Sequence, residues 1–154
     1  MFKIKKSIII LSTILFLPEF IEANSNANNR IIIDISEQRL YLFEKDIIKQ
    51  SFPVSTSSFG EGSIENSFKT PLGSHEIKEK IGTNVPINTI FIARVNTSKR
   101  AKIINETINS DDDFVTSRIL WLDGLEEGKN KGSGVDSYDR YIYIHGTHEE
   151  GLIG

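Results

Sequence analysis

The sequence predicts a mainly β fold, a sandwich or barrel of mixed strands with little helix. Short runs rich in β-branched and aromatic residues recur along the chain, and Gly, Pro, Asn, Asp or Ser separates them. Apolar residues alternate with polar ones in several runs, as at Leu40 and Leu42, which is the period of a half-buried strand. Only residues 99–108 could form a helix. A chain of 154 residues allows one domain of modest size.

The N-terminus has the features of a secretory signal peptide. Lys3, Lys5 and Lys6 precede an apolar run that closes at Pro18. This run is about half as long as a helix that crosses the ~30 Å hydrocarbon core, so we expect no permanent membrane anchor. We predict a signal peptide over residues 1–23, a short polar linker over residues 24–29 and the folded domain over residues 30–154.

The strands of the domain follow in order. Three β-rich runs, at residues 31–35, 39–43 and 47–54, predict an antiparallel meander. A long loop is expected over residues 55–74, with a tight turn at Thr70-Pro71-Leu72-Gly73. The segment from Gly124 to Gly134 holds four glycines and is expected to be an exposed loop. Further strands are predicted at residues 75–80, 89–95, 118–122 and 140–145.

Charge and composition exclude several classes of function. The chain has 18 Lys and Arg and 21 Asp and Glu, which gives a net charge of −3, and it has no basic tract. A nucleic acid partner is therefore not expected. The chain contains no cysteine. This excludes disulfides, thiolate zinc sites, iron–sulfur clusters and a cysteine nucleophile within these residues.

The run from Tyr141 to His148 contains the most informative candidate residues. An alternating apolar strand ends at His145, and Gly146 follows at once. A neutral imidazole accepts a proton near neutral pH, and a glycine lets the backbone approach a ligand closely. A strand that ends in an exposed histidine without any catalytic role explains the same pattern.

Metal and nucleotide sites have weak support. His75, His145 and His148 are nitrogen donors of the kind that zinc prefers, but their spacing matches no zinc motif. The run from Asp111 to Asp113 lacks the alternating ligands and the distal Glu of a calcium loop. The glycine-rich segments lack the Lys-Ser/Thr of a phosphate-binding loop. We expect neither a metal nor a cofactor.

Taken in chain order, several segments resemble the L,D-transpeptidase catalytic domain, often called the YkuD domain, of bacterial cell-wall enzymes. The resemblance spans roughly residues 30–154. Ile144-His145-Gly146-Thr147 matches the first half of the active-site signature of that family. The other matching pieces are residues 33–43, Phe52-Pro53-Val54-Ser55-Thr56, Lys69-Thr70-Pro71-Leu72-Gly73, Leu120-Trp121-Leu122 and residues 136–141.

The resemblance implies a function and a set of site residues. Members use a cysteine to transfer an acyl group between peptidoglycan stem peptides, forming 3→3 cross-links or attaching proteins, in cell-wall biogenesis. By the same resemblance His145 is the general base, Gly146 and Thr147 bind substrate, and no cofactor is needed. The partners would be peptidoglycan stem peptides, and the protein would be exported to the periplasm or cell wall of a bacterium.

The second half of the family signature, Ser/Thr-His-Gly-Cys, is absent from these residues. The sequence ends at Gly154, nine residues after His145. We therefore expect a domain that lacks its C-terminal part, exposes Ile142 or Ile144 on one flank and performs no transpeptidation. The alternatives are a non-catalytic peptidoglycan-binding module, a non-functional fragment and a secreted structural β domain without a ligand.

Overall fold

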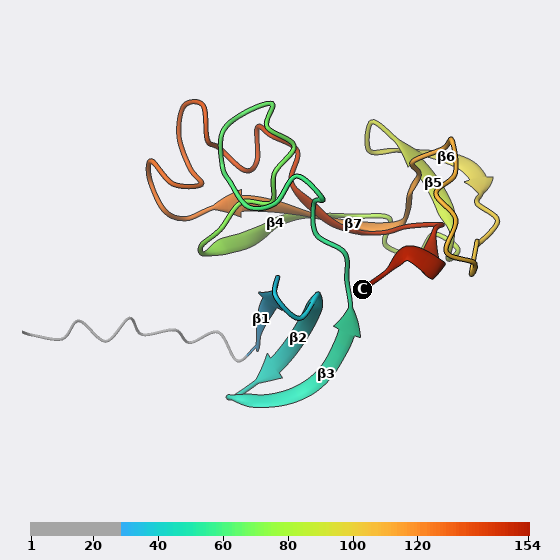
Figure 1. The fold of residues 1–154 in the computed structure, drawn as a ribbon, viewed down its shortest axis with the longest axis horizontal. Coiled ribbons are helices and arrows are strands. Elements are labelled where there is room, and N and C mark those ends of the chain that lie inside the picture. Colours follow the sequence, from blue (N-terminus) through green and yellow to red (C-terminus); the bar gives the residue numbers. More distant parts are fainter. Residues whose placement is uncertain (1–28) are drawn as a thin grey trace, which may run out of the picture.

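The computed structural model describes residues 29–154 and shows a mainly β fold (Figure 1). Two antiparallel sheets contain the strands, so the predicted fold class is confirmed. The predicted signal peptide and nearly all of the predicted linker lie outside the described residues. The elements are β1 (Asn29–Asp34), β2 (Arg39–Glu44), β3 (Ile47–Pro53), β4 (His75–Ile81), β5 (Thr89–Ile92), β6 (Val95–Arg100), β7 (Val115–Gly124), β8 (Tyr143–Gly146) and the 3₁₀ turn η1 (Glu150–Leu152).

The first sheet is the predicted three-stranded meander, in the order β1-β2-β3. The turn between β1 and β2 is held by Asp34, whose Oδ1 accepts the backbone N–H groups of Ser36 at 2.9 Å and Glu37 at 3.1 Å. Lys45 and Asp46 form the two-residue connection to β3, and both have positive φ. Such a turn matches the right-handed twist of the strands that it joins.

The second sheet is organised around β7. β4 pairs with residues 119–124 of β7 and β5 with residues 115–116, while β8 pairs with residues 116–121. β6 continues the sheet beyond β5. The long strand β7 therefore connects all parts of this sheet, and β8 holds the candidate histidine against it.

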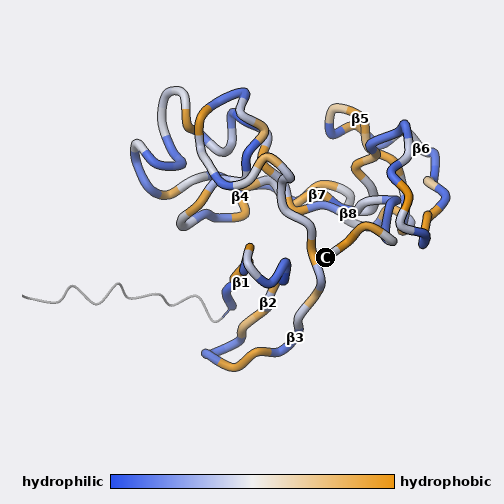
Figure 2. Tube along the Cα trace, viewed as in Figure 1, coloured by the Kyte–Doolittle hydropathy of each residue, from blue (hydrophilic) through white to orange (hydrophobic). Residues whose placement is uncertain are grey.

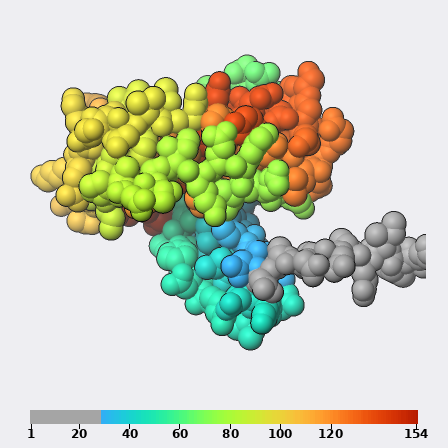
Figure 3. Space-filling view, turned by 180° about the vertical axis from the view of Figure 1, so that it is seen from behind, coloured from blue at the N-terminus to red at the C-terminus, as the bar shows by residue number. Residues whose placement is uncertain are grey.

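The buried apolar core belongs to the second sheet. Phe91, Ile119 and Trp121 form it, and other apolar and aromatic side chains pack around them. In the first sheet, Leu40 is buried, whereas Phe52 is 46% exposed. Figure 2 shows apolar residues along β2 and the start of β3, and Figure 3 shows these strands as a lobe that protrudes from the body of the molecule. The two sheets thus differ in how much apolar surface they bury.

The predicted helix over residues 99–108 is wrong. β6 runs to Arg100, and the residues that follow form no helix. The backbone N–H of Ile104 donates to the carbonyl of His148 at 2.8 Å, and Gly151 N–H donates to the carbonyl of Ile104 at 3.0 Å. These long-range bonds replace those of a helix, which explains why local propensity fails here.

The prediction of an exposed loop over residues 124–134 is also wrong in part. No strand crosses it, but Asn130 is 0% exposed. Its side-chain amide donates to the carbonyls of Leu72 and Ser74, both at 3.0 Å, and accepts the backbone N–H of Glu126 at 2.9 Å. A buried polar side chain with its hydrogen bonds satisfied organises this loop.

Three smaller expectations also change. Ile142 and Ile144 are half-buried rather than exposed, because this segment follows β7, with Leu122 N–H donating to the carbonyl of Ile142 at 2.9 Å. Asn29, predicted as linker, begins β1. The predicted strand over residues 89–95 is divided by a turn into β5 and β6.

Among the described residues, no helix is long and apolar enough to cross a membrane.

Candidate functional site

Strand β8 presents His145 at the edge of the second sheet. His145 lies opposite Ile119 of β7, which is only 1% exposed. The imidazole itself is exposed. The backbone of His145 is therefore held against the core, while its side chain is open to solvent and to a ligand.

A backbone carbonyl orients the imidazole of His145. The Nδ1 atom lies 2.9 Å from the carbonyl oxygen of Gly146. Because a carbonyl only accepts, Nδ1 is the donor in this contact, and in a neutral ring Nε2 would be the nitrogen that can accept a proton. This is the tautomer that a general base facing a substrate needs.

Gly146 lies where a side chain would not fit. A Cβ atom there would be 2.9 Å from Thr116 Oγ1, 3.0 Å from the carbonyl oxygen of Thr116 and 3.3 Å from Ser117 Cβ. The ladder between β7 and β8 has a bulge at this point, which brings the two backbones close together. The sequence predicts that Gly146 lets the backbone approach a ligand, whereas the structure shows that it lets β8 approach β7.

Thr147 begins the turn that follows β8. Its hydroxyl accepts the backbone N–H of Glu149 at 3.1 Å. The carboxylate of Glu149 in turn accepts the backbone N–H of Ser110 at 2.5 Å, and this hydrogen bond lowers the pKa of Glu149. The structure therefore shows Thr147 as a turn residue. Its predicted role in substrate binding stays a prediction, as does that of Gly146.

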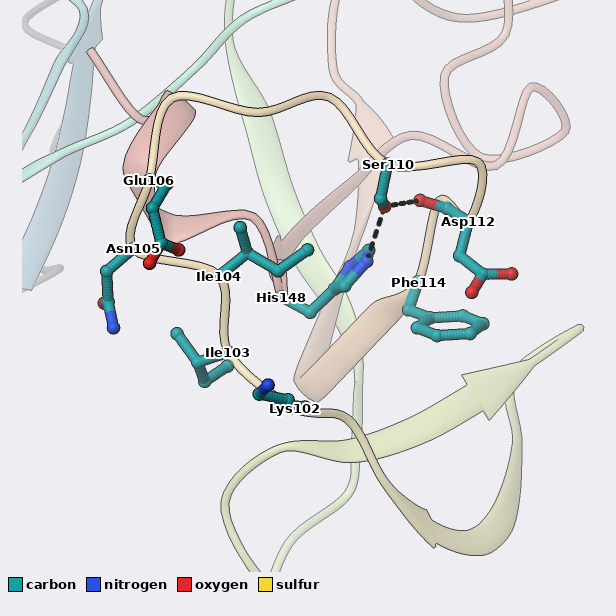
Figure 4. A pocket seen from close by; sticks show the side chains of 9 residues that line it. All are labelled: Lys102, Ile103, Ile104, Asn105, Glu106, Ser110, Asp112, Phe114 and His148. Atoms are coloured by element: carbon teal, nitrogen blue, oxygen red, sulfur yellow. Dashed lines mark hydrogen bonds between the residues drawn. The ribbon is translucent and has the colours of Figure 1, made fainter.

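A pocket of about 520 Å³ lies beside this turn, and His148, not His145, lines it (Figure 4). His148 is only 4% exposed, and its ring lies 4.8 Å from that of Phe114. Its Nε2 is 3.0 Å from Ser110 Oγ, which donates to the carbonyl of Asp112. The other lining residues are Lys102, Ile103, Ile104, Asn105 and Glu106.

His148 is paired on one side of its ring only. Because the Ser110 hydroxyl already donates to a carbonyl, His148 Nε2 carries the proton that Ser110 Oγ accepts. No polar atom of residues 29–154 pairs with the buried Nδ1. This contact holds the segment around Ser110 close to the end of β8.

The three histidines do not come together. His75 lies in β4, where its Nε2 is 2.9 Å from Ser137 Oγ and its Nδ1 is 3.0 Å from the carbonyl of Gly73. His148 is paired with Ser110, and His145 with a backbone carbonyl. In the described part of the chain, no group of three His, Asp or Glu residues is arranged to hold a metal ion.

Comparison with protein families gives a match to the L,D-transpeptidase catalytic domain (YkuD), over residues 28–153. The chain belongs to this family. Comparisons with curated proteins and with solved structures gave no match. The match includes both sheets and the segment Ile144-His145-Gly146-Thr147, so the resemblance predicted from the sequence is confirmed.

Membership of the L,D-transpeptidase family gives the coarse chemistry. The family consists of acyltransferases, and its substrate is peptidoglycan. Within this catalytic domain, β8 presents an exposed imidazole whose Nδ1 lies 2.9 Å from the Gly146 carbonyl. The 154 residues contain no cysteine.

Sequence reasoning missed two side chains near the candidate base in this L,D-transpeptidase domain. The sequence presents His148 only as a possible metal ligand, whereas the structure shows it as a buried packing residue. Arg94 was placed within a predicted strand, whereas it lies in a turn and contacts Tyr143 of β8. No spacing pattern links residue 94 to residue 143, so only the tertiary structure reveals this contact.

Proposed function

We propose that this chain provides the stem-peptide-binding and proton-accepting part of a peptidoglycan L,D-transpeptidase, and that these 154 residues alone transfer no acyl group. The observation that carries the proposal is the exposed imidazole of His145, whose Nδ1 lies 2.9 Å from the Gly146 carbonyl within a domain of that family. The absence of cysteine supports the second half of the proposal.

His145 would accept the proton of the nucleophile. In the family reaction, a thiol gives its proton to the base, and the thiolate adds to the carbonyl between the diamino acid and D-alanine of a stem peptide. D-alanine leaves with a proton, and a thioester remains. The amine of a second stem peptide then displaces the sulfur, which forms the 3→3 cross-link and restores the thiol.

The hydroxyl groups of Thr147 and Ser110 are poor substitutes for a thiol. Thr147 Oγ1 already accepts the N–H of Glu149, and Ser110 Oγ is bonded to His148 and to a backbone carbonyl. A hydroxyl is also far less acidic than a thiol. We therefore propose that covalent catalysis is absent from these residues.

The same chemistry implies a location. Peptidoglycan lies outside the cytoplasmic membrane, and the lysine-rich start with its apolar run is typical of export. We propose that the protein acts in the periplasm or cell wall of a bacterium. Attachment of proteins to stem peptides is a second reaction that the same site would support.

Acylation by a β-lactam tests the absence of covalent catalysis. We expect the purified chain to show no mass increase after incubation with a carbapenem, measured by intact-protein mass spectrometry. A stoichiometric adduct would reveal an unrecognised nucleophile and contradict the proposal.

Binding to purified sacculi tests whether the chain recognises peptidoglycan. We expect saturable binding in a pull-down, and reduced binding to sacculi whose stem peptides have been removed by an amidase. Binding that does not saturate would identify the chain as a non-functional fragment. Saturable binding that is indifferent to the stem peptides would instead favour a glycan-binding module.

The role of His145 is tested in a lengthened version that carries the Ser/Thr-His-Gly-Cys half of the family signature after Gly154. We expect His145→Ala to lower the rate of acyl-enzyme formation by about 10⁴-fold, because the nucleophile and its base act as a unit. Glu150→Gln, at an exposed position nearby, is the matched control and should leave the rate unchanged. An unaltered rate in His145→Ala would remove His145 from the mechanism.

A further inference from the structure

Arg94 is a cation without an acidic partner. It lies in the turn between β5 and β6, and its guanidinium lies over the rings of Trp121 at 4.8 Å and Tyr141 at 4.7 Å. Its NH1 group donates to the Tyr143 hydroxyl at 3.1 Å. Among residues 29–154, no carboxylate lies within 4 Å of this guanidinium. Its charge is stabilised by ring faces rather than by a counter-ion.

The hydrogen-bonding edge of Arg94 remains available. A guanidinium has five N–H donors, and the side chain of Arg94 makes one hydrogen bond within the described chain. None of its nitrogens is among the buried polar atoms that lack a partner. The remaining donors are therefore not fully buried, while the aromatic rings of Trp121 and Tyr141 lie against the guanidinium plane.

The turn that carries Arg94 is not one that its sequence favours. Ala93 has φ 47° and Arg94 has φ 69°, and a two-residue hairpin turn with both residues left-handed prefers Asn-Gly. Each such residue costs about 1–2 kcal/mol in this conformation. The long-range contacts of Arg94 with Trp121, Tyr141 and Tyr143 offset this cost. They hold the side chain in one orientation.

Arg94 is directed toward the strand that carries the candidate base. Its hydrogen-bond partner Tyr143 and His145 are two residues apart on β8, so both side chains project from the same face of the sheet. Two residues of a strand span about 6.6 Å. The Tyr143 hydroxyl that Arg94 contacts and the imidazole of His145 therefore belong to side chains on one face of β8, within the reach of a single peptide.

We propose that Arg94 binds a carboxylate of the peptide ligand whose scissile carbonyl is presented to His145. A guanidinium with free edge donors matches the two oxygens of a carboxylate, and its fixed orientation reduces the entropy lost on binding. The inference rests on the proposed function for the identity of the peptide, a stem peptide with a free carboxylate. The recognition itself depends only on the residues around Arg94.

Calorimetric titration with a matched pair of ligands tests this inference. The probes are a stem tetrapeptide ending in D-alanine and the same peptide with a C-terminal amide. We expect the acid to bind at least about tenfold more tightly than the amide, because a charge-assisted hydrogen bond is lost in the amide. Arg94→Gln should abolish this preference, and Arg94→Lys should keep part of it. Equal affinities for both peptides in the unaltered chain would overturn the proposal.

The neighbouring Arg100 provides the matched control. It is exposed on β6, and its Nε donates to the carbonyl of Ile87 rather than lying over aromatic rings. Arg100→Gln should keep the preference for the acid. Trp121 is the single tryptophan of the chain, so its fluorescence reports binding beside Arg94. We expect the Trp121 fluorescence to change when the acid peptide is added and to stay constant with the amide. An unchanged fluorescence with the acid peptide would count against the site.

A second variant separates binding from folding. In Ala93→Asn/Arg94→Gly the turn has the sequence that its geometry prefers, so we expect thermal stability to be retained or raised and the preference for the acid to be lost. A variant that folds and still prefers the acid would refute the role of Arg94. If the unaltered chain binds sacculi saturably but shows no preference for the acid, this inference fails while the proposed function stands.

Discussion

Gly146 is a position where the packing between two strands requires a residue without a side chain. The Thr116 backbone and hydroxyl occupy the space that a Cβ atom would need. Thr116 is 0% exposed, and within the described chain its Oγ1 has no hydrogen-bond partner. His145 directly precedes Gly146, so its position depends on how closely β8 approaches β7.

Replacement of Gly146 tests this dependence. We expect Gly146→Ala to lower the free energy of unfolding by about 1–3 kcal/mol, as overpacking does in a well-packed region. The cost should be about 1 kcal/mol smaller in a Thr116→Ala background, because the nearest clashing atom is then absent. Chemical denaturation of the four proteins of this cycle measures the coupling, and additive costs would contradict the proposed clash.

Asp123 is a buried carboxylate that makes stability depend on pH. The Lys78 ammonium, 2.8 Å away, and Lys131, 3.5 Å away, hold the pKa of Asp123 below its ordinary value. A lowered pKa in the folded state stabilises the fold above the unfolded-state pKa of about 3.9, and this contribution is lost as the pH falls through the folded-state pKa.

The variant Asp123→Asn should therefore be less stable than the unaltered chain at pH 7, and the difference should shrink below about pH 4. Thermal unfolding followed by circular dichroism across this range measures both proteins. Asp139→Asn, at an exposed position, serves at pH 7 as the control for loss of charge alone. A difference that stays constant from pH 7 to acid would remove Asp123 as the source.

At the scale of elements, β7 pairs with β4, β5 and β8, and the loop after β7 packs against β4. The loop from Gly124 to Ser137 has no strands, yet it contains two of the fully buried side chains, Asn130 and Ser137. Ser137 N–H donates to the carbonyl of Asn130 at 2.9 Å, and Ser137 Oγ lies 2.9 Å from His75 Nε2 of β4. The polar cluster of Asn130, Ser137 and His75, rather than apolar packing, therefore holds the loop against β4.

Truncation of Asn130 tests how much this cluster contributes. We expect Asn130→Ala to destabilise the fold by about 2–4 kcal/mol, because three hydrogen bonds are lost and buried backbone groups lose their partners. Lys131→Ala is not a neutral comparison, since Lys131 contacts Asp123. Gly128→Ala, in open space on the same loop, reports the cost of backbone strain alone. Equal costs for the two variants would mean that the cluster does not hold the loop.

At the scale of the whole molecule, the two sheets differ in how much apolar surface they bury. The second sheet contains the buried cluster of Phe91, Ile119 and Trp121, whereas the first leaves Ile32, Ile47 and Ile48 exposed by 43%, 62% and 52%. Just after β3, the Ser55 hydroxyl donates to the carbonyl of Leu152 at 3.2 Å. The free energy of local unfolding is lowest where few apolar contacts are buried.

Amide hydrogen exchange measures this difference directly. We expect the amides of β1, β2 and β3 to exchange faster than those of β7, because the meander can open without disrupting the core of the second sheet. Peptide-level mass spectrometry on the native chain resolves the two regions. Equal protection in β2 and β7 would show that the two sheets unfold as one unit.

The sequence by itself determined the fold class, most of the strands and the family. Alternation at Leu40 and Leu42, the β-branched runs and the glycine after His145 are local signals, and period and turn chemistry act over a few residues. The meander, the long loop after it and the strand that ends at the His-Gly pair could therefore be read directly from the residues. The role of His145 remains a prediction of the family resemblance, because the structure shows its exposure and its orientation and not its chemistry.

The tertiary structure alone decided where distant segments meet. Pairing of Ile104 with His148 removed the predicted helix, and hydrogen bonds to Leu72 and Ser74 buried an asparagine in a glycine-rich loop. The contact of Arg94 with Tyr143 arose in the same way. Each of these depends on partners more than 40 residues away in sequence. Their free energy is gained only once the chain has folded, so no local pattern encodes them.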